Sequence, residues 1–284
     1  MARPSWLVLA LLTACRTVVV QEGAIITPIP DRPLNAEATA AQLPGYSHED
    51  HRVVAADGTT LYAVLLRHPD APLTVLFFGG NQFRISEHGL ATARTLAPMG
   101  TSLMVVDIRG YGRSEGKPTL ALLLSDALVV FDSLTAIPGI DPRSVVVHGH
   151  SLGSFLAGHV AANRSTGGVV LQSSVTTAEE WTRSLTPWWM RPFVRMRPAE
   201  SLKGQGNLEN VRRLEEPLMV LVGSEDRVTP PGLSRALYEA ATLPPGRKRL
   251  AILEGAGHND LDRHARFREV YESFLSLVSD PGER

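Results

Sequence analysis

One serine of this 284-residue chain lies in a setting that favours nucleophilic catalysis. Ser151 stands between Gly149 and Gly153 in the pattern G-x-S-x-G, directly after the apolar run 144–147. On a tight turn from strand to helix, a serine exposes its hydroxyl at the end of a sheet, and small neighbours let strand and helix approach. The helix that follows favours negative charge at its N-terminus. We therefore predict that Ser151 is a nucleophile.

Three further segments, together with the serine turn, resemble motifs of the α/β-hydrolase family. Segment 107–114 resembles the loop D-x-R-G-x-G-x-S of that family, segment 223–230 its acid loop G-x-x-D-x-x-x-P, and segment 255–258 its histidine loop. The resemblance covers about residues 52–278, and the order serine, aspartate, histidine is also that of the family. It implies an α/β-hydrolase fold and a serine hydrolase.

The resemblance also places two partners beside Ser151. His258 is expected to remove the serine proton and to return it to the leaving group. Asp226 is expected to hold the imidazole in the correct tautomer and to stabilise the imidazolium that forms. The chemistry implied is acyl transfer through an acyl-enzyme.

The oxyanion of such a reaction needs two backbone N–H donors. One is expected from Leu152, the residue after the nucleophile. The other is expected from Asn81, with Gln82 as the neighbouring alternative. The family commonly has His-Gly in this loop, whereas this chain has Gly79-Gly80.

Other histidines and acids are weaker candidates for the site. His148 and His150 flank Ser151, and a residue next to the nucleophile points elsewhere at such a turn. Asp126 has no motif around it, and Glu225 does not match the acid position of its loop. Asp107, Arg109 and His159 are expected to be structural.

Apolar runs alternate with helical patterns through the body of the chain. Strands are predicted at 52–56, 60–66, 73–78, 102–106, 144–147, 169–171, 218–222 and 249–253, with a hairpin turn at Asp57-Gly58. Helices are predicted at 87–97, 119–134, 152–162, 233–241 and 262–278. This order predicts an α/β fold with a mainly parallel sheet and helices on both faces. The hydrolase domain is expected to span 51–280.

One segment, about 175–217, breaks this alternation and is predicted to be a helical cap. It holds Trp181, Trp188 and Trp189, and its basic residues outnumber its acidic ones between 183 and 203. The tryptophans either pack within the cap or line the substrate site. The basic residues either form a solvated face or meet anionic lipid headgroups.

The N-terminus has the pattern of a targeting signal. Residues 1–14 combine a basic start with a short apolar run, as signal peptides do, and the run is too short to span a bilayer. Residues 12–15 resemble the bacterial lipobox, in which the cysteine becomes the lipidated first residue, and Cys15 is the only cysteine of the chain. Residues 15–50 are then a lipidated N-terminus and an extended linker. The resemblance implies a bacterial envelope protein on the periplasmic side of the outer membrane.

The composition excludes several classes of function. The formal net charge is −1, which leaves no overall basic field to hold nucleic acid, and one cysteine cannot form an internal disulfide or a Cys-rich zinc site. No metal or organic cofactor is implied. The expected substrate is a small or lipid-like carboxylic ester or thioester. Two alternatives remain: a serine peptidase of the same fold, and a non-catalytic, surface-anchored binding protein.

Overall fold

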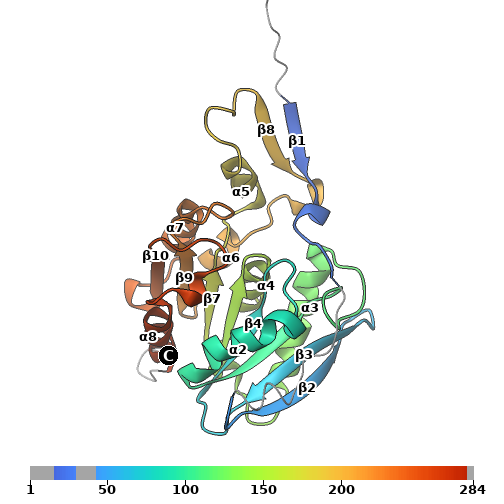
Figure 1. The fold of residues 1–284 in the computed structure, drawn as a ribbon, viewed down its shortest axis with the longest axis vertical. Coiled ribbons are helices and arrows are strands. Elements are labelled where there is room, and N and C mark those ends of the chain that lie inside the picture. Colours follow the sequence, from blue (N-terminus) through green and yellow to red (C-terminus); the bar gives the residue numbers. More distant parts are fainter. Residues whose placement is uncertain (1–15, 30–42, 280–284) are drawn as a thin grey trace, which may run out of the picture.

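The computed structural model describes residues 16–29 and 43–279, which form one sheet of eight strands with helices around it (Figure 1). The strands follow one another across the sheet in the order β10-β9-β7-β6-β4-β5-β3-β2. Their bounds are β2 Ser47–Val54, β3 Thr60–Arg67, β4 Leu73–Phe78, β5 Thr101–Asp107, β6 Val145–His150, β7 Gly168–Gln172, β9 Leu218–Gly223 and β10 Lys248–Leu253.

The sheet is mainly parallel. Only β3 runs against its neighbours, since it pairs antiparallel with both β2 and β5, while all other neighbouring strands are parallel. Every residue of β4 and of β9 is buried, as expected for parallel strands covered on both faces. The predicted fold class is confirmed.

Helices cover both faces of the sheet. The main helices are α2 Leu90–Leu96, α3 Leu120–Thr135, α4 Leu152–Ala161, α7 Pro231–Ala240 and α8 Phe267–Ser279. Successive strand residues alternate between two cores: Leu76 and Phe78 belong to the core with α3, α4 and α7, whereas Val75 and Phe77 belong to the core with α2 and α8. Single-turn helices lie at Glu22–Ala24, Ala97–Met99, Pro142–Ser144, Glu200–Leu202, Pro245–Arg247 and Leu261–Arg263, and a π-helical turn at Ile85–Gly89 precedes α2.

The inserted segment differs from the helical cap that the sequence predicts. It contains two short helices, α5 Ala178–Ser184 and α6 Leu208–Arg212, and between them the strand β8 Val194–Pro198. This strand pairs in parallel with β1 Arg16–Val20, so that a two-stranded ribbon projects beyond the main body (Figure 1). The first residues of the expected linker are therefore paired. A run of three valines suits a strand, but the sequence does not show which partner it takes.

Two boundaries also differ from expectation. The last helix begins at Phe267 rather than at 262, because the short turn Leu261–Arg263 precedes it. The β2–β3 hairpin has a longer loop than a two-residue turn, closed by the bond from the Ala55 N–H to the Thr59 carbonyl.

The predicted signal peptide and Cys15 lie outside the described residues, as does most of the expected linker. In the described part of the chain, no helix has the length and apolar character needed to cross a bilayer.

Candidate active site

The turn between β6 and α4 holds Ser151 in a backbone conformation that side chains rarely adopt, with φ 52° and ψ −115°. The Ser151 N–H donates to the Gln172 carbonyl at 2.9 Å, which ties the turn to the next strand. A side chain at Gly149 would overlap the backbone of Gly153, and one at Gly153 would overlap the Phe78 carbonyl. Both glycines are therefore required by packing, and the serine is presented at the carboxyl edge of the sheet.

The structure brings Ser151, His258 and Asp226 together, although they are far apart in the sequence. The His258 Nε2 atom lies 2.9 Å from the Ser151 Oγ, and its Nδ1 atom lies 2.8 Å from the Asp226 Oδ2. A neutral imidazole that donates its Nδ1–H to the carboxylate keeps Nε2 free to accept the serine proton. In this arrangement, His258 Nε2 can accept the proton of the Ser151 hydroxyl.

Asp226 is held as an anion. The residue is only 3% exposed, and burial raises its pKa, but the hydrogen bond with His258 and those from Thr229 outweigh this effect. The backbone N–H groups of Val228 and Thr229 donate to one carboxylate oxygen at 2.9 and 2.8 Å, and the Thr229 hydroxyl donates to the other at 2.8 Å. Its pKa is consequently below the ordinary value, so a full negative charge faces the imidazole at neutral pH.

The two expected oxyanion donors lie on either side of the serine. Leu152 is the first residue of α4, and neither its N–H nor that of Asn81 has an acceptor within the described residues. The Gly80 backbone packs against Ser151, since a Cβ placed there would lie 3.3 Å from the serine Cβ. The following loop turns back at Gln82, whose φ is 67°. Both N–H groups are thus available at the edge of the cleft.

The side chain of Asn81 has a role that the sequence did not indicate. Its Oδ1 atom accepts hydrogen bonds from the Tyr111 hydroxyl at 2.8 Å and from the Thr27 N–H at 2.9 Å. These two bonds join the loop to the segment 107–114 and to the chain just after β1. Thr27 and Asn81 are 54 positions apart in the sequence. A contact between such distant residues leaves no local signal in the sequence.

The two histidines beside Ser151 do not face its hydroxyl. His148 is buried between Gln172, at 3.0 Å from its Nε2, and the Tyr271 hydroxyl, at 3.1 Å from its Nδ1. The His150 Nε2–H donates to the carbonyl of His258 at 3.0 Å, so His150 positions the backbone of the expected base. The prediction that neither serves as the base agrees with this geometry, but the sequence missed the positioning contact.

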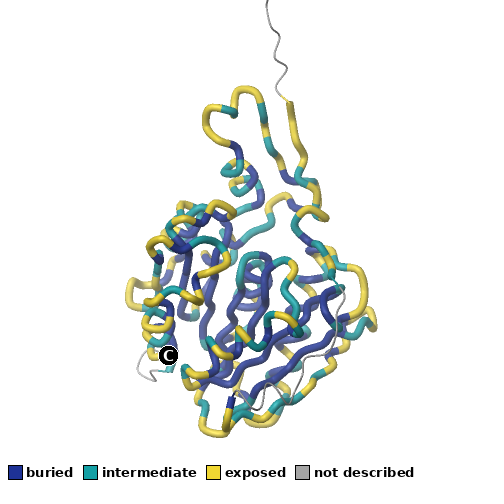
Figure 2. The backbone as a smooth tube through the Cα atoms, viewed as in Figure 1, coloured by how far each residue is buried: buried dark blue, intermediate teal, exposed yellow. Residues whose placement is uncertain are grey.

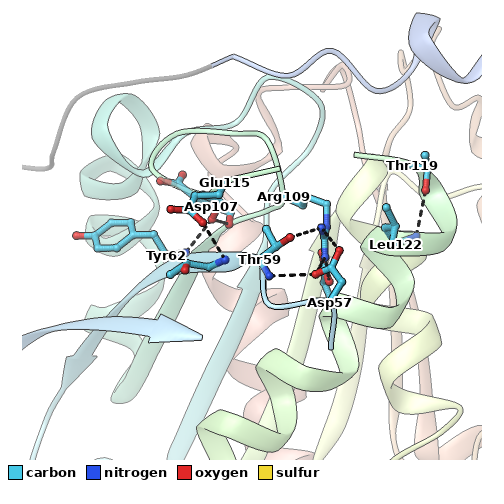
Figure 3. Close-up of polar contacts among 11 residues, drawn as sticks. Asp57, Thr59, Tyr62, Asp107, Arg109, Glu115, Thr119 and Leu122 are labelled. Carbon is cyan, nitrogen blue, oxygen red and sulfur yellow. Dashed lines mark hydrogen bonds and ion pairs between the residues drawn. The ribbon is translucent and has the colours of Figure 1, made fainter. Parts of the chain in front are cut away.

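The charged residues around the segment 107–114 bond to one another and to nearby backbone and hydroxyl groups (Figure 3). The Asp107 carboxylate accepts from the N–H groups of Ile85 at 2.8 Å and Arg113 at 3.0 Å. Arg109 bonds to Asp126 and to the half-exposed Asp57. These contacts explain why Asp126 is not available as an acid for the site. Glu225 is exposed beside Asp226. His159 of α4 contacts Asn163, which follows the helix.

A cleft of about 1200 Å³ opens onto the serine. Its lining combines Ser151 and His258 with Val18 of β1 and with Trp181 and Met196 of the inserted segment. The Trp181 Nε1–H also donates to the Val228 carbonyl at 2.8 Å, which ties α5 to the loop of Asp226. Trp181 therefore both lines the cleft and packs, whereas Trp188 and Trp189 are exposed elsewhere.

Acid should destabilise this site through its two flanking histidines. Burial lowers the pKa of His148 to about 3 and that of His150 to about 4, where the charge of His258 adds to the effect. Because both values lie below 6.5, the native state binds fewer protons than the unfolded chain, and stability falls as the pH drops below 6.5 toward the folded values. From pH 7 to pH 5 each histidine should contribute a loss of about 2 kcal/mol in the free energy of unfolding.

Urea unfolding at the two pH values measures this loss. In His148→Gln, the difference between pH 7 and pH 5 should shrink by about 2 kcal/mol relative to the wild type. An unchanged difference would show that His148 takes up a proton equally in the native and unfolded states between pH 7 and pH 5, and a histidine kept neutral by burial with Gln172 and Tyr271 would then be wrong.

Comparison with known proteins places the chain in a family. It matches the prolyl oligopeptidase family over residues 88–279. It is 32% identical to an uncharacterised protein of Mycobacterium tuberculosis over 168 residues, which are 59% of this chain and 57% of that one. It is 26% identical to the human alpha/beta hydrolase domain-containing protein 17B over 209 residues, 73% of this chain and 68% of the human one. The chain thus spans about 57% of the length of the mycobacterial relative.

Solved structures with the same fold include several esterases. An esterase of Pyrococcus furiosus superposes with a TM-score of 0.72 at 17% identity, over 90% of this chain and 98% of the other. Acetyl xylan esterase 1 from Thermoanaerobacterium gives 0.65 at 15% identity, over 90% and 97%. The superpositions show that the chain shares the α/β-hydrolase fold of these proteins, and the family match shows that it belongs to the prolyl oligopeptidase family.

Proposed function

We propose that this protein is a serine hydrolase that cleaves carboxylic esters or thioesters through an acyl-enzyme, with Ser151, His258 and Asp226 as its catalytic triad. The observation that carries the proposal is the continuous series of hydrogen bonds from the serine hydroxyl through the imidazole to a buried carboxylate. Each bond has the length expected of a donor and acceptor in direct contact.

The reaction follows from these contacts. The Ser151 Oγ attacks the carbonyl carbon while His258 Nε2 takes its proton, and the carbonyl oxygen becomes an anion beside the N–H groups of Leu152 and Asn81. When the tetrahedral intermediate collapses, the imidazolium gives its proton to the leaving alcohol or thiol. Water then attacks the acyl-enzyme with the same base, and the acid product leaves. Asp226 stays ionised throughout.

The lining of the cleft favours a substrate with an apolar part. Apolar side chains of β1 and β8 and the ring of Trp181 line the same cleft as the serine. Two of the neighbouring structures are named as esterases, which supports ester bonds over amide bonds. The family name supports the alternative, a serine peptidase, and a puromycin hydrolase is among the structures with this fold, at a TM-score of 0.62 and 17% identity.

A fluorophosphonate probe tests the nucleophile. The wild-type chain should be labelled with one probe per molecule, because the activated Ser151 hydroxyl attacks phosphorus as it would attack an acyl carbon. Ser151→Ala should remove the labelling entirely, whereas Ser154→Ala, a change at a buried serine one helical turn away, should leave a labelled protein. Equal labelling of wild type and Ser151→Ala would refute the proposal. Rates on a series of p-nitrophenyl esters and peptide p-nitroanilides would then separate esterase from peptidase.

A lipid anchor at Cys15 is part of the proposal. The only cysteine of the chain stands at the lipobox position. We propose attachment to the periplasmic side of a bacterial outer membrane.

A further inference from the structure

The ribbon of β1 and β8 and the loop that leads into β8 carry most of the exposed large apolar side chains. We use the name "tip" for residues 16–19 and 187–197. Trp188 is 79% exposed, Trp189 60% and Phe193 52%. With two valines of β1, five of the seven large apolar side chains that are exposed in the described part of the chain lie here. The tip projects away from the sheet and its surface is mostly exposed (Figure 2). Exposed apolar side chains gathered in one place indicate a contact surface.

The charge of the tip has one sign. Its only charged residues are Arg16, Arg191, Arg195 and Arg197, and it contains no Asp or Glu. All four are exposed, and none has an ion pair with a described carboxylate. The nearest acidic residue that follows in the chain, Glu200, is paired with Lys203. Four arginines without neighbouring carboxylates are complementary to an anionic surface.

The tip is also where the chain leaves toward its N-terminus. The Arg16 N–H donates to the Phe193 carbonyl at 2.8 Å, and the residue bonded to Arg16 is Cys15, the expected site of lipid attachment. An acyl anchor there holds the tip, rather than another face of the molecule, close to the bilayer. A basic and aromatic surface beside the lipid anchor adds a second contact with the bilayer.

We propose that the tip is a membrane-contact surface for an anionic bilayer. Trp188, Trp189 and Phe193 enter the interfacial layer, where tryptophan is favoured, and the arginines contact lipid phosphates.

The ribbon joins this surface to the active-site cleft. In the register of the two strands, Val18 lies beside Met196 and Val20 beside Pro198, and Val18, Val20 and Met196 all line the cleft that holds Ser151. An apolar path therefore runs from the membrane surface to the serine. If the proposed ester hydrolysis is correct, on which this step rests, the substrate is an acyl ester that resides in the bilayer and enters along the ribbon.

Fluorescence quenching tests the contact on the full-length protein purified from membranes and reconstituted into vesicles. With phosphatidylglycerol vesicles that contain phospholipids brominated on the acyl chain, the tryptophan emission should be quenched at least about twofold. Trp188→Phe together with Trp189→Phe should remove most of this quenching, because Trp6 is removed with the predicted signal peptide and the remaining Trp181 is bonded to Val228. Arg195→Gln with Arg197→Gln should shift half-maximal quenching to about tenfold more anionic lipid.

Two outcomes would overturn the proposal. Emission that bromolipids leave unchanged, while iodide quenches it equally with and without vesicles, would place the tip in water. Emission that depends on protein concentration in the absence of lipid would show that a second copy of the chain covers the tip.

Activity provides an independent measurement. Trp188→Ser with Trp189→Ser should lower hydrolysis of a long-chain ester embedded in vesicles by at least about tenfold and leave kcat/KM for a soluble p-nitrophenyl ester within about twofold. Val54→Ser, at another exposed apolar residue, should change neither. Equal loss on both substrates, or on neither, refutes the path to the serine. Absence of any Ser151-dependent hydrolysis would instead refute the proposed function, while quenching would still report on the tip.

Discussion

Replacing His258 with glutamine should lower kcat/KM for a soluble p-nitrophenyl ester by about 10⁴-fold or more. The imidazole is the only group within hydrogen-bond distance of the Ser151 Oγ among the described side chains, at 2.9 Å. Glutamine keeps a hydrogen-bonding side chain of similar length but cannot accept and return a proton near neutral pH. The loss should appear mainly in kcat, because the serine, the oxyanion donors and the cleft remain in place.

His159→Gln is the matched control, since it makes the same change on α4 at a histidine bonded to Asn163 and distant from the cleft. Its activity should stay within about twofold of the wild type. Residual activity of His258→Gln above a tenth of the wild-type value would mean that another base acts on Ser151. His150 would then be the candidate to examine, since its ring lies 5.2 Å from that of His258.

Residues whose role depends on local geometry could be predicted from the sequence. The turn at Ser151 needs a glycine on each side for packing, and that requirement is visible in five consecutive residues. Asp226 and His258 were predicted because their loops resemble the acid and histidine loops of the α/β-hydrolase family, and a parallel sheet brings loops at the ends of its strands to one edge. The sheet itself followed from the alternation of apolar runs with helical patterns.

Residues that act through contacts between distant segments could not be predicted. His150 holds the carbonyl of His258 across 108 positions, and Thr27 holds the side chain of Asn81 across 54. The pairing of β1 with β8 is of the same kind, since a valine run shows that a strand is favoured but not where it pairs. Thr229 is the exception: it lies three residues after Asp226, where a hydroxyl can reach back to the carboxylate, and its position in the acid loop was a usable signal.

The other large effect concerns Arg109, which connects the segment 107–114 to α3 and to the β2–β3 loop (Figure 3). Its guanidinium makes two parallel bonds to Asp126 of α3, at 2.7 and 2.8 Å, and two to Asp57 of the β2–β3 loop, at 2.8 and 3.1 Å. A further bond of 2.7 Å reaches the Thr59 hydroxyl. Arg109 is 3% exposed and Asp126 is 5% exposed. The guanidinium also holds the pKa of Asp57 well below its ordinary value.

Arg109→Met should lower the free energy of unfolding by about 3–5 kcal/mol. Methionine fills much of the space but leaves the Asp126 carboxylate buried without its cation, and a buried charge with no partner is far more costly than the pair. Urea unfolding measures the loss. Adding Asp126→Asn should recover part of it, because a neutral amide costs less to bury than a carboxylate, and the two changes should therefore be non-additive.

Arg164 offers the matched control, since its guanidinium bonds to Asp132 in the same two-point manner, at 2.7 and 2.8 Å, but at the surface. The two side chains are 36% and 50% exposed, so Arg164→Met should cost no more than about 1 kcal/mol. Equal losses for the two variants would show that burial does not set the strength of the Arg109 contacts. A stable Arg109→Met would show that the segment 107–114 owes its position to Asp107 rather than to Arg109.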